Sequence, residues 1–279
     1  MKKIFQIIGL ITLIIFSFFY TDKVLEVVRE EDKIMIKLES IKETAEKKPI
    51  DAKIVKDTII PGITGRTINV EKSYKKMKNT GIFNQKEIVY DIIKPNISII
   101  NNKDKYITSG NPNNQKVSII FILNSNKYLN NLEKIIDNKG IVVNYFINYQ
   151  YLINNTTKIK EIINKEFYSY GENGKYTPDS LLFSNNLISR ISNNNANICL
   201  TKEKNNEIIN LCSKNDLYTI LPNIIITEKP YKQVKENLTS GSIILLNINQ
   251  DTLTEISLVI DYINGKGLNI VGLNELITE

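Results

Sequence analysis

Two cysteines are the residues whose chemistry is easiest to assign in this sequence. Cys199 and Cys212 are the only cysteines among 279 residues, and histidine is absent. Cys199 stands at the end of an expected strand and Cys212 in the last turns of the helix after it. A strand–helix return could bring their Cα atoms within the roughly 4.4–6.8 Å that a disulfide requires. A disulfide suits an oxidising compartment, and two buried free thiols are the alternative. Zinc binding by two isolated thiols without histidine is not favoured.

Other residue types with catalytic or binding chemistry form no convincing group. Glu166 and Glu172 are two carboxylates close in sequence, but nothing else supports a glycosidase pair. Gly62 and Gly65 do not form a phosphate-binding loop, because no helix with Lys-Ser/Thr follows at the required spacing. The formal charge of +6 is mild and does not concentrate in a basic stripe with interleaved aromatic residues. The sequence therefore argues against a nucleic-acid partner.

The N-terminus indicates a membrane anchor. Lys2 and Lys3 precede an apolar run from Ile4 to Tyr20, close to the roughly 17–25 residues that span a bilayer. Cationic residues before such a run favour a cytoplasmic N-terminus. The run ends in Phe-Ser-Phe-Phe-Tyr without the small residues of a cleavage site. We therefore expect residues 1–21 to be an uncleaved signal anchor, with a single-pass chain in the cell membrane and an extracytoplasmic C-terminal domain. A cleaved signal peptide and a buried core helix are the alternatives.

Three further segments follow the anchor. Residues 22–48 are rich in Lys and Glu with apolar residues at helical spacing, which predicts a charged helical stalk or, alternatively, a partly disordered linker. Residues 49–115 suggest a small α+β appendage with a Pro61-Gly62 turn, a helix over 71–78, and strands over 97–100 and 105–108. In residues 116–279, strands alternate with helical patterns, which predicts βαβ units and a parallel sheet. The expected strands are 117–123, 141–147, 167–170, 197–200, 217–221, 242–247 and 268–271, and the expected helices are 128–138, 156–165, 179–191, 205–214, 231–238 and 253–266.

Several of these segments resemble the polysaccharide deacetylases, whose shared domain is called the NodB-homology domain. The motif Ser-Gly-Ser-Ile-Ile-Leu-Leu-Asn at 240–247, Gly-Leu-Asn-Ile-Val at 267–271 and Leu-Asn-Glu-Leu at 273–276 are similar to the end of that domain. Val-Ser-Ile-Ile-Phe at 117–121 resembles its first strand and Asn-Tyr-Phe-Ile at 144–147 its second. The resemblance covers residues 116–279 in order. It implies an α/β fold, an irregular (β/α) barrel.

The same resemblance implies that the metal chemistry of the family is lost. Ile122 and Leu123 stand where the family has its two aspartates, and Tyr170 and Gly174 stand in place of its paired histidines. The Arg-Pro-Pro motif of the family falls near Leu-Thr-Lys at 200–202, and its late catalytic histidine falls on Asn247. Isoleucine and leucine neither ligate a metal nor accept a proton, and asparagine is no general acid. We therefore expect no catalytic residues, no metal and no cofactor.

By the same analogy, neutral polar residues would gather at the pocket mouth. Amide side chains and aromatic rings suit sugar hydroxyls and sugar faces. The chain is thus expected to be a membrane-anchored pseudoenzyme that binds or scaffolds cell-envelope glycan in a bacterium. Ordinary loop residues are the alternative for the site, and an active carbohydrate deacetylase or hydrolase with a non-histidine site is the alternative for the function. The candidate substrate-binding residues are Asn124, Asn126, Tyr170, Glu172 and Asn247, with Thr201 and Asn223 nearby.

Overall fold

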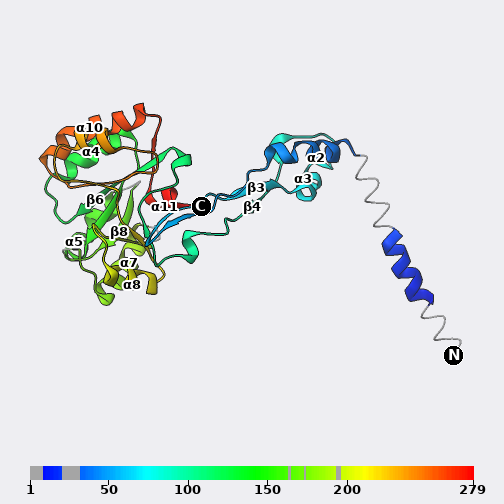
Figure 1. Ribbon diagram of the computed structural model, residues 1–279, viewed down its shortest axis with the longest axis horizontal. Coiled ribbons are helices and arrows are strands. Elements are labelled where there is room, and N and C mark those ends of the chain that lie inside the picture. The colour runs from blue at the N-terminus through cyan, green and yellow to red at the C-terminus, as the bar shows by residue number, and fades with distance from the viewer. Residues whose placement is uncertain (1–8, 21–31, 163–164, 173, 193–195) are drawn as a thin grey trace. The chain divides into compact units, whose positions relative to one another are not determined.

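The protein divides into two compact units in the computed structural model, which describes residues 9–20, 32–162, 165–172, 174–192 and 196–279 (Figure 1). The larger unit comprises Ile50–Ile63 and Pro95–Glu279, and the smaller one Met1–Pro49 and Thr64–Lys94. These units divide the chain differently from the expected boundaries at residues 49 and 115. The reason is that β1 (Lys53–Val55), β2 (Thr58–Ile60) and β5 (Tyr106–Ile107) join a sheet of the larger unit.

In the smaller unit, helices α2 (Lys33–Ala45) and α3 (Val70–Met77) pack together beside a two-stranded antiparallel sheet. Its buried side chains include Ile34 and Leu38 of α2, and Tyr74 and Met77 of α3. The apolar stripe expected for a stalk helix is thus used for packing in the described part of residues 22–48. The sheet consists of β3 (Gly65–Ile68) and β4 (Tyr90–Ile93), and a short 3-10 helix spans Gln85–Glu87.

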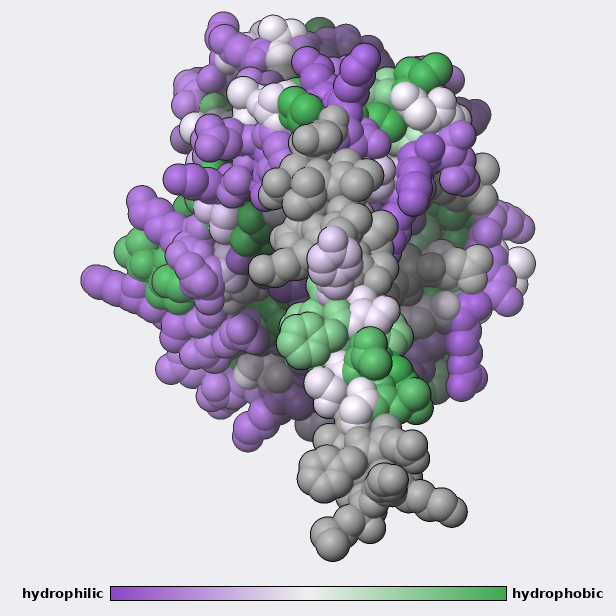
Figure 2. Space-filling model, turned by 90° about the vertical axis from the view of Figure 1, so that its right-hand side faces the viewer, coloured by the Kyte–Doolittle hydropathy of each residue, from purple (hydrophilic) through white to green (hydrophobic). Residues whose placement is uncertain are grey.

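The expected anchor is described only in part. Residues 9–20 are helical, and nearly all their large apolar side chains are exposed; Figure 2 shows them as a mostly green and white segment. Within the described residues, no helix has both the length and the apolar character needed to cross a membrane. Residues 4–8 of the expected run lie outside the described residues. The anchor therefore stays a prediction.

Two mainly parallel sheets form the larger unit. Both sheets contribute side chains to a shared apolar core, which lies between them. The strand order of the first sheet is β11 (Ile224–Ile226), β12 (Ile243–Leu246), β6 (Lys116–Leu123), β7 (Asn144–Asn148) and β8 (Glu166–Tyr170), with β13 (Asn269–Ile270) also paired to β6. The strand order of the second sheet is β1, β2, β5, β10 (Tyr218–Ile220) and β9 (Ile198–Leu200).

Helices follow the strands and cover a second apolar core. Figure 1 shows α4 and α10 together on one flank of the larger unit. Gly140 ends α4 in a left-handed conformation, φ 64°, which glycine adopts without steric cost. The helices are α4 (Leu129–Lys139), α5 (Tyr149–Asn154), α6 (Thr156–Glu161), α7 (Pro178–Ser192), α8 (Asn206–Lys214), α9 (Pro230–Asn237), α10 (Gln250–Gly265) and α11 (Leu273–Ile277). Short 3-10 helices span Ile99–Asn101 and Pro112–Asn114.

The expected fold class is thus confirmed as a mixed α/β fold with parallel sheets, and a few elements differ. The strand β11 was missed. A 3-10 helix replaces the strand expected at 97–100, because the N–H of Ile99 donates to the Glu279 carboxylate (3.1 Å to Oε1) and is not free for a sheet. The helix expected over 156–165 is observed as α6, Thr156–Glu161, and the short helix α5 before it was not expected.

A buried polar network joins the first sheet to the C-terminal helix. Asn144 is fully buried in β7, and its Nδ2 donates to Ser118 Oγ (2.7 Å) and to the Ile119 carbonyl (2.9 Å). Its Oδ1 accepts from the N–H of Leu273, the first residue of α11 (2.8 Å). Ser118 Oγ in turn donates to the Val271 carbonyl (2.9 Å). One amide side chain therefore satisfies polar groups of two other elements, β6 and α11.

Candidate functional site

A pocket of about 460 Å³ opens at the carboxyl ends of the parallel strands of the first sheet. Carboxyl ends of parallel strands are the usual position of ligand sites in α/β folds. Residues from or just after β6, β7, β8, β9 and β12 form its walls. The lining residues are Ile122, Asn124, Asn148, Tyr170, Lys202, Asn247 and Ile248.

The pocket brings together three of the five candidate residues, Asn124, Tyr170 and Asn247. Asn126 does not line it. The Asn126 Oδ1 accepts from the Tyr151 hydroxyl (2.5 Å), and its Nδ2 donates to Asn155 Oδ1 (3.0 Å). These bonds hold Asn126 against α5 and the residue after it. Asn126 is therefore not among the residues that line this pocket, and its part in binding stays a prediction.

Glu172 also lies outside the pocket lining. Its Oε2 accepts from Asn148 Nδ2 (2.8 Å). Thr201 is buried, and its hydroxyl donates to the Glu203 carbonyl (2.6 Å). Asn223 accepts from the N–H of Ile243 (2.7 Å) and so fastens the start of β12. Each of these three side chains thus forms a hydrogen bond within the protein, which stabilises the local structure.

Sequence reasoning missed Asn148, Lys202 and Ile248 among the lining residues. Asn148 ends β7 and caps α5, since its Oδ1 accepts from the N–H of Gln150 (2.9 Å). Lys202 comes two residues after β9, within the stretch matched to the Arg-Pro-Pro motif. The available signal in both cases was a polar residue at the end of a buried strand or within two residues of it.

Four pocket residues have polar groups that the described part of the protein leaves free. The side chains of Asn124, Asn247 and Tyr170 form no hydrogen bond with any described residue, and Lys202 forms no ion pair with one. Burial raises the pKa of Tyr170, so its hydroxyl keeps its proton at neutral pH and can donate. Amide, phenol and ammonium groups thus line one cavity, and their donors and acceptors are available to a ligand as far as the described residues are concerned.

The pocket lacks the donor set that a catalytic zinc needs. Its lining groups are amides, a phenol, an ammonium and isoleucines, whereas zinc takes imidazole, thiolate or carboxylate ligands. Within the described residues, no cluster of three or more Cys, Asp or Glu could hold a metal ion. The residues present do not fit the metal of the resembling family, so the lining supports no metal-dependent step.

The two residues matched to the family aspartates face opposite sides of β6. Ile122 lines the pocket and belongs to the core between the sheets, whereas Leu123 is fully buried in the core between sheet and helices. The reason is the alternation of side chains along a strand. The next side chain on the pocket side is Asn124, so the pocket-facing pair is Ile122 and Asn124.

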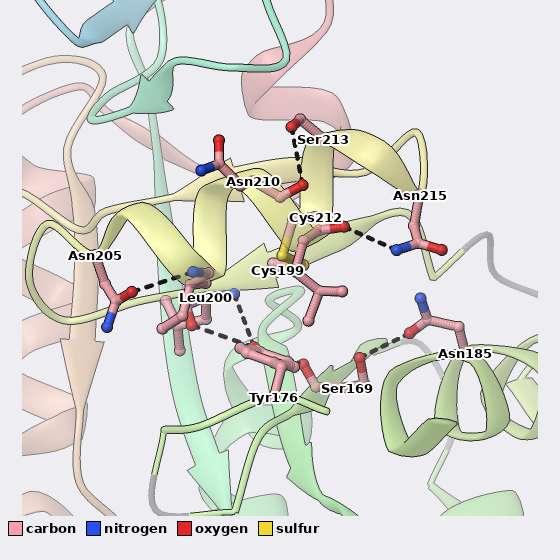
Figure 3. Close-up of a disulfide and its surroundings, with 12 residues drawn as sticks. Ser169, Tyr176, Asn185, Cys199, Leu200, Asn205, Asn210, Cys212, Ser213 and Asn215 are labelled. Atoms are coloured by element: carbon pink, nitrogen blue, oxygen red, sulfur yellow. Dashed lines mark hydrogen bonds between the residues drawn. A yellow bond between two sulfur atoms is a disulfide. The ribbon is translucent and has the colours of Figure 1, made fainter. Parts of the chain in front are cut away.

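A disulfide secures the strand that leads to Lys202. Cys199 in β9 and Cys212 in α8 are joined with their Cα atoms 6.4 Å apart, and both are fully buried (Figure 3). The Tyr176 hydroxyl accepts from the N–H of Leu200 (3.0 Å) and lies 3.2 Å from the Ser169 carbonyl of β8. It therefore bridges β8 and β9, which have no ladder of backbone hydrogen bonds between them.

Comparison with known proteins supports the fold. No protein-family model matches the sequence. The chain is 27% identical over 258 residues to the uncharacterized protein YlxY of Bacillus subtilis (strain 168), covering 84% of this chain and 80% of that protein. It resembles the structure of wild-type BA3943 of Bacillus anthracis, described as a CE4 family pseudoenzyme, with a TM-score of 0.66 and 20% identity over 89% of this chain and 96% of that one.

Further solved structures agree. A BA3943 mutant described as having restored enzymatic activity has a TM-score of 0.66 at 20% identity, over 89% of this chain and 99% of that one. PdaA of Bacillus subtilis, a family 4 carbohydrate esterase, has a TM-score of 0.55 at 12% identity, over 82% of this chain and 97% of that one. The resemblance inferred from the sequence is thus confirmed for the fold: the chain has the fold of the family 4 carbohydrate esterases, the polysaccharide deacetylases.

Proposed function

We propose that this protein is a catalytically inactive deacetylase-like protein that binds cell-envelope glycan in the pocket at the strand ends. The observation that carries the proposal is the cavity of about 460 Å³, lined by hydrogen-bonding groups that the described residues leave unpartnered. Amides and a phenol suit sugar hydroxyl and N-acetyl groups. The absence of carboxylate and imidazole from the lining supports binding without hydrolysis. The description of BA3943 as a pseudoenzyme supports the same reading for a chain of this fold.

Binding and turnover of glycan by the purified full-length chain test this proposal. We expect N-acetylglucosamine oligomers or peptidoglycan fragments to bind, and no acetate to be released with or without added zinc. Asn247→Ala and Tyr170→Phe should each weaken binding by about two- to tenfold, the range expected for the loss of one neutral hydrogen bond. Isothermal titration calorimetry measures the affinity.

Asn210→Ala is the matched control, because Asn210 is exposed on α8 and outside the pocket lining. It should bind like the wild type. Release of acetate above the background of a heat-treated sample would instead establish an active enzyme with a non-histidine site. Unchanged affinity in both pocket variants would show that any glycan binds elsewhere.

We further propose that residues 4–20 anchor the chain in the cell membrane, with the compact units outside the cytoplasm. Lys2 and Lys3 before an apolar run support this orientation. A disulfide between buried cysteines also suits an extracytoplasmic location. Protease added to intact spheroplasts is expected to digest the larger unit, whereas a cytoplasmic marker protein stays intact. Full protection of the chain would refute the orientation, and release of a soluble form would show that the anchor is cleaved.

A further inference from the structure

Among the described residues that line the pocket, Lys202 is the one that carries a charge. It forms no ion pair with any described residue, although its neighbour Lys204 pairs with Asp57 at 2.7 Å. An ammonium group beside a cavity, without a carboxylate partner, attracts anions. We propose that the glycan bound in this pocket carries an anionic substituent, a carboxylate or a phosphate, and that Lys202 binds it. This inference rests on the proposed function and deepens it by naming the class of ligand.

No carboxylate of the described residues forms an ion pair with Lys202. Glu172, the carboxylate at the mouth expected from the sequence, is outside the lining and accepts from the amide of Asn148. The carboxylate of Asp57 forms an ion pair with Lys204. The lining therefore carries a net positive charge, which favours an acidic ligand over a neutral one of the same shape.

The protein also fixes the backbone from which Lys202 projects. The preceding residue, Thr201, donates its N–H to the Ile220 carbonyl (3.0 Å), and its hydroxyl binds the Glu203 carbonyl on the other side of Lys202. Three residues before Lys202, Cys199 is tied to α8 by the disulfide. An ammonium on so constrained a backbone loses less conformational freedom on binding than one on a mobile loop.

Neutral donors stand around the same cavity. The free amides of Asn124 and Asn247 and the protonated phenol of Tyr170 can donate to the oxygens of an anion or to the sugar that carries it. Hydrogen bonds to an ionised acceptor are about twice as strong as neutral ones. A lysine supplemented by neutral donors is therefore a coherent anion-binding arrangement.

Three tetrasaccharides with the same β-1,4 N-acetylhexosamine backbone test this inference. The first is the neutral N-acetylglucosamine tetramer, the second a peptide-free peptidoglycan fragment in which alternate sugars carry a lactyl carboxylate, and the third a phosphorylated N-acetylglucosamine tetramer. We expect the full-length protein to bind at least one acidic probe about fivefold or more tightly than the neutral probe, and the preference to shrink as salt rises. Comparison of the two acidic probes identifies which anion is preferred.

Variants then assign the preference to Lys202. Lys202→Ala should remove the preference for acidic probes, while its affinity for the neutral probe stays within about twofold of the wild-type value. Lys202→Glu should make the neutral probe the preferred one, and Lys202→Arg should keep most of the preference for acidic probes. Lys204→Ala is the matched control, since that lysine lies two residues away, outside the pocket lining. Equal affinity for neutral and acidic probes, unchanged in Lys202→Ala, would overturn this inference and leave glycan binding standing. Failure of all three probes to bind would overturn the proposed function itself.

Discussion

Replacing both Cys199 and Cys212 by alanine is expected to lower the free energy of unfolding of the larger unit by about 3 kcal/mol. The disulfide joins residues 13 apart in sequence, and the chain-entropy model assigns a closed loop of that size about this stabilisation. Both cysteines are fully buried, so the loss of their sulfur atoms adds a packing cost to the entropic one. A thermal midpoint lower by about 6–12 °C should accompany the change. Thermal and urea unfolding followed by circular dichroism measure both quantities.

Reductant provides the control for this experiment. Wild-type protein unfolded in dithiothreitol should approach the midpoint of the double variant, whereas the double variant should not respond to dithiothreitol. Labelling of two thiols in the unreduced, denatured wild type would contradict the bridge. Equal midpoints of the wild type with and without reductant would contradict its role in stability.

Asn144→Ala is expected to destabilise the larger unit by about 3 kcal/mol or more. Three buried polar groups would each lose one hydrogen bond: the Ile119 carbonyl, Ser118 Oγ and the N–H of Leu273. Each buried group left without a hydrogen bond costs about 1–3 kcal/mol, and Ser118 retains its bond to the Val271 carbonyl. Because Leu273 begins α11, we also expect amide hydrogen exchange to accelerate in this helix. Urea unfolding and hydrogen-exchange mass spectrometry measure the two effects.

Asn138→Ala is the matched control for Asn144→Ala. Asn138 is exposed on α4, so its replacement should change stability by less than about 0.5 kcal/mol. A cost of Asn144→Ala as small as that of the control would mean that the buried network is not needed for the fold. If amide hydrogen exchange accelerated equally over the whole larger unit, this result would contradict the inference that Asn144 specifically holds α11 in place.

Local sequence patterns predicted the long elements of the larger unit well. The strand β6 is a continuous apolar run because it is buried on both faces. The periodicity of α4 and α10 reflects helices with one buried face. Each of these signals lies within a single segment, so it can be read without knowing what the segment packs against.

Elements with long-range partners were harder to place. The strand β11 has only three residues and is defined by its pairing with β12. The strands β1 and β2 looked like part of an appendage, but β2 pairs with β5, which in turn pairs with β10, far along the chain. Short strands carry too little periodicity to reveal which sheet they join.

The sequence by itself determined that histidine chemistry is excluded, because no fold can supply a side chain that the chain lacks. It also indicated the alternation of strands and helices and placed Asn124, Tyr170 and Asn247 at strand ends. Tertiary structure alone decided which side chains reach the pocket. Residues distant in sequence compete for the same polar groups, and the resulting hydrogen bonds hold some candidates away from the cavity. Thus Tyr151 and Asn155 bind Asn126, Asn148 binds Glu172, and strand alternation turns Leu123 away from the pocket, whereas Lys202 lines the pocket without an ion pair to any described residue.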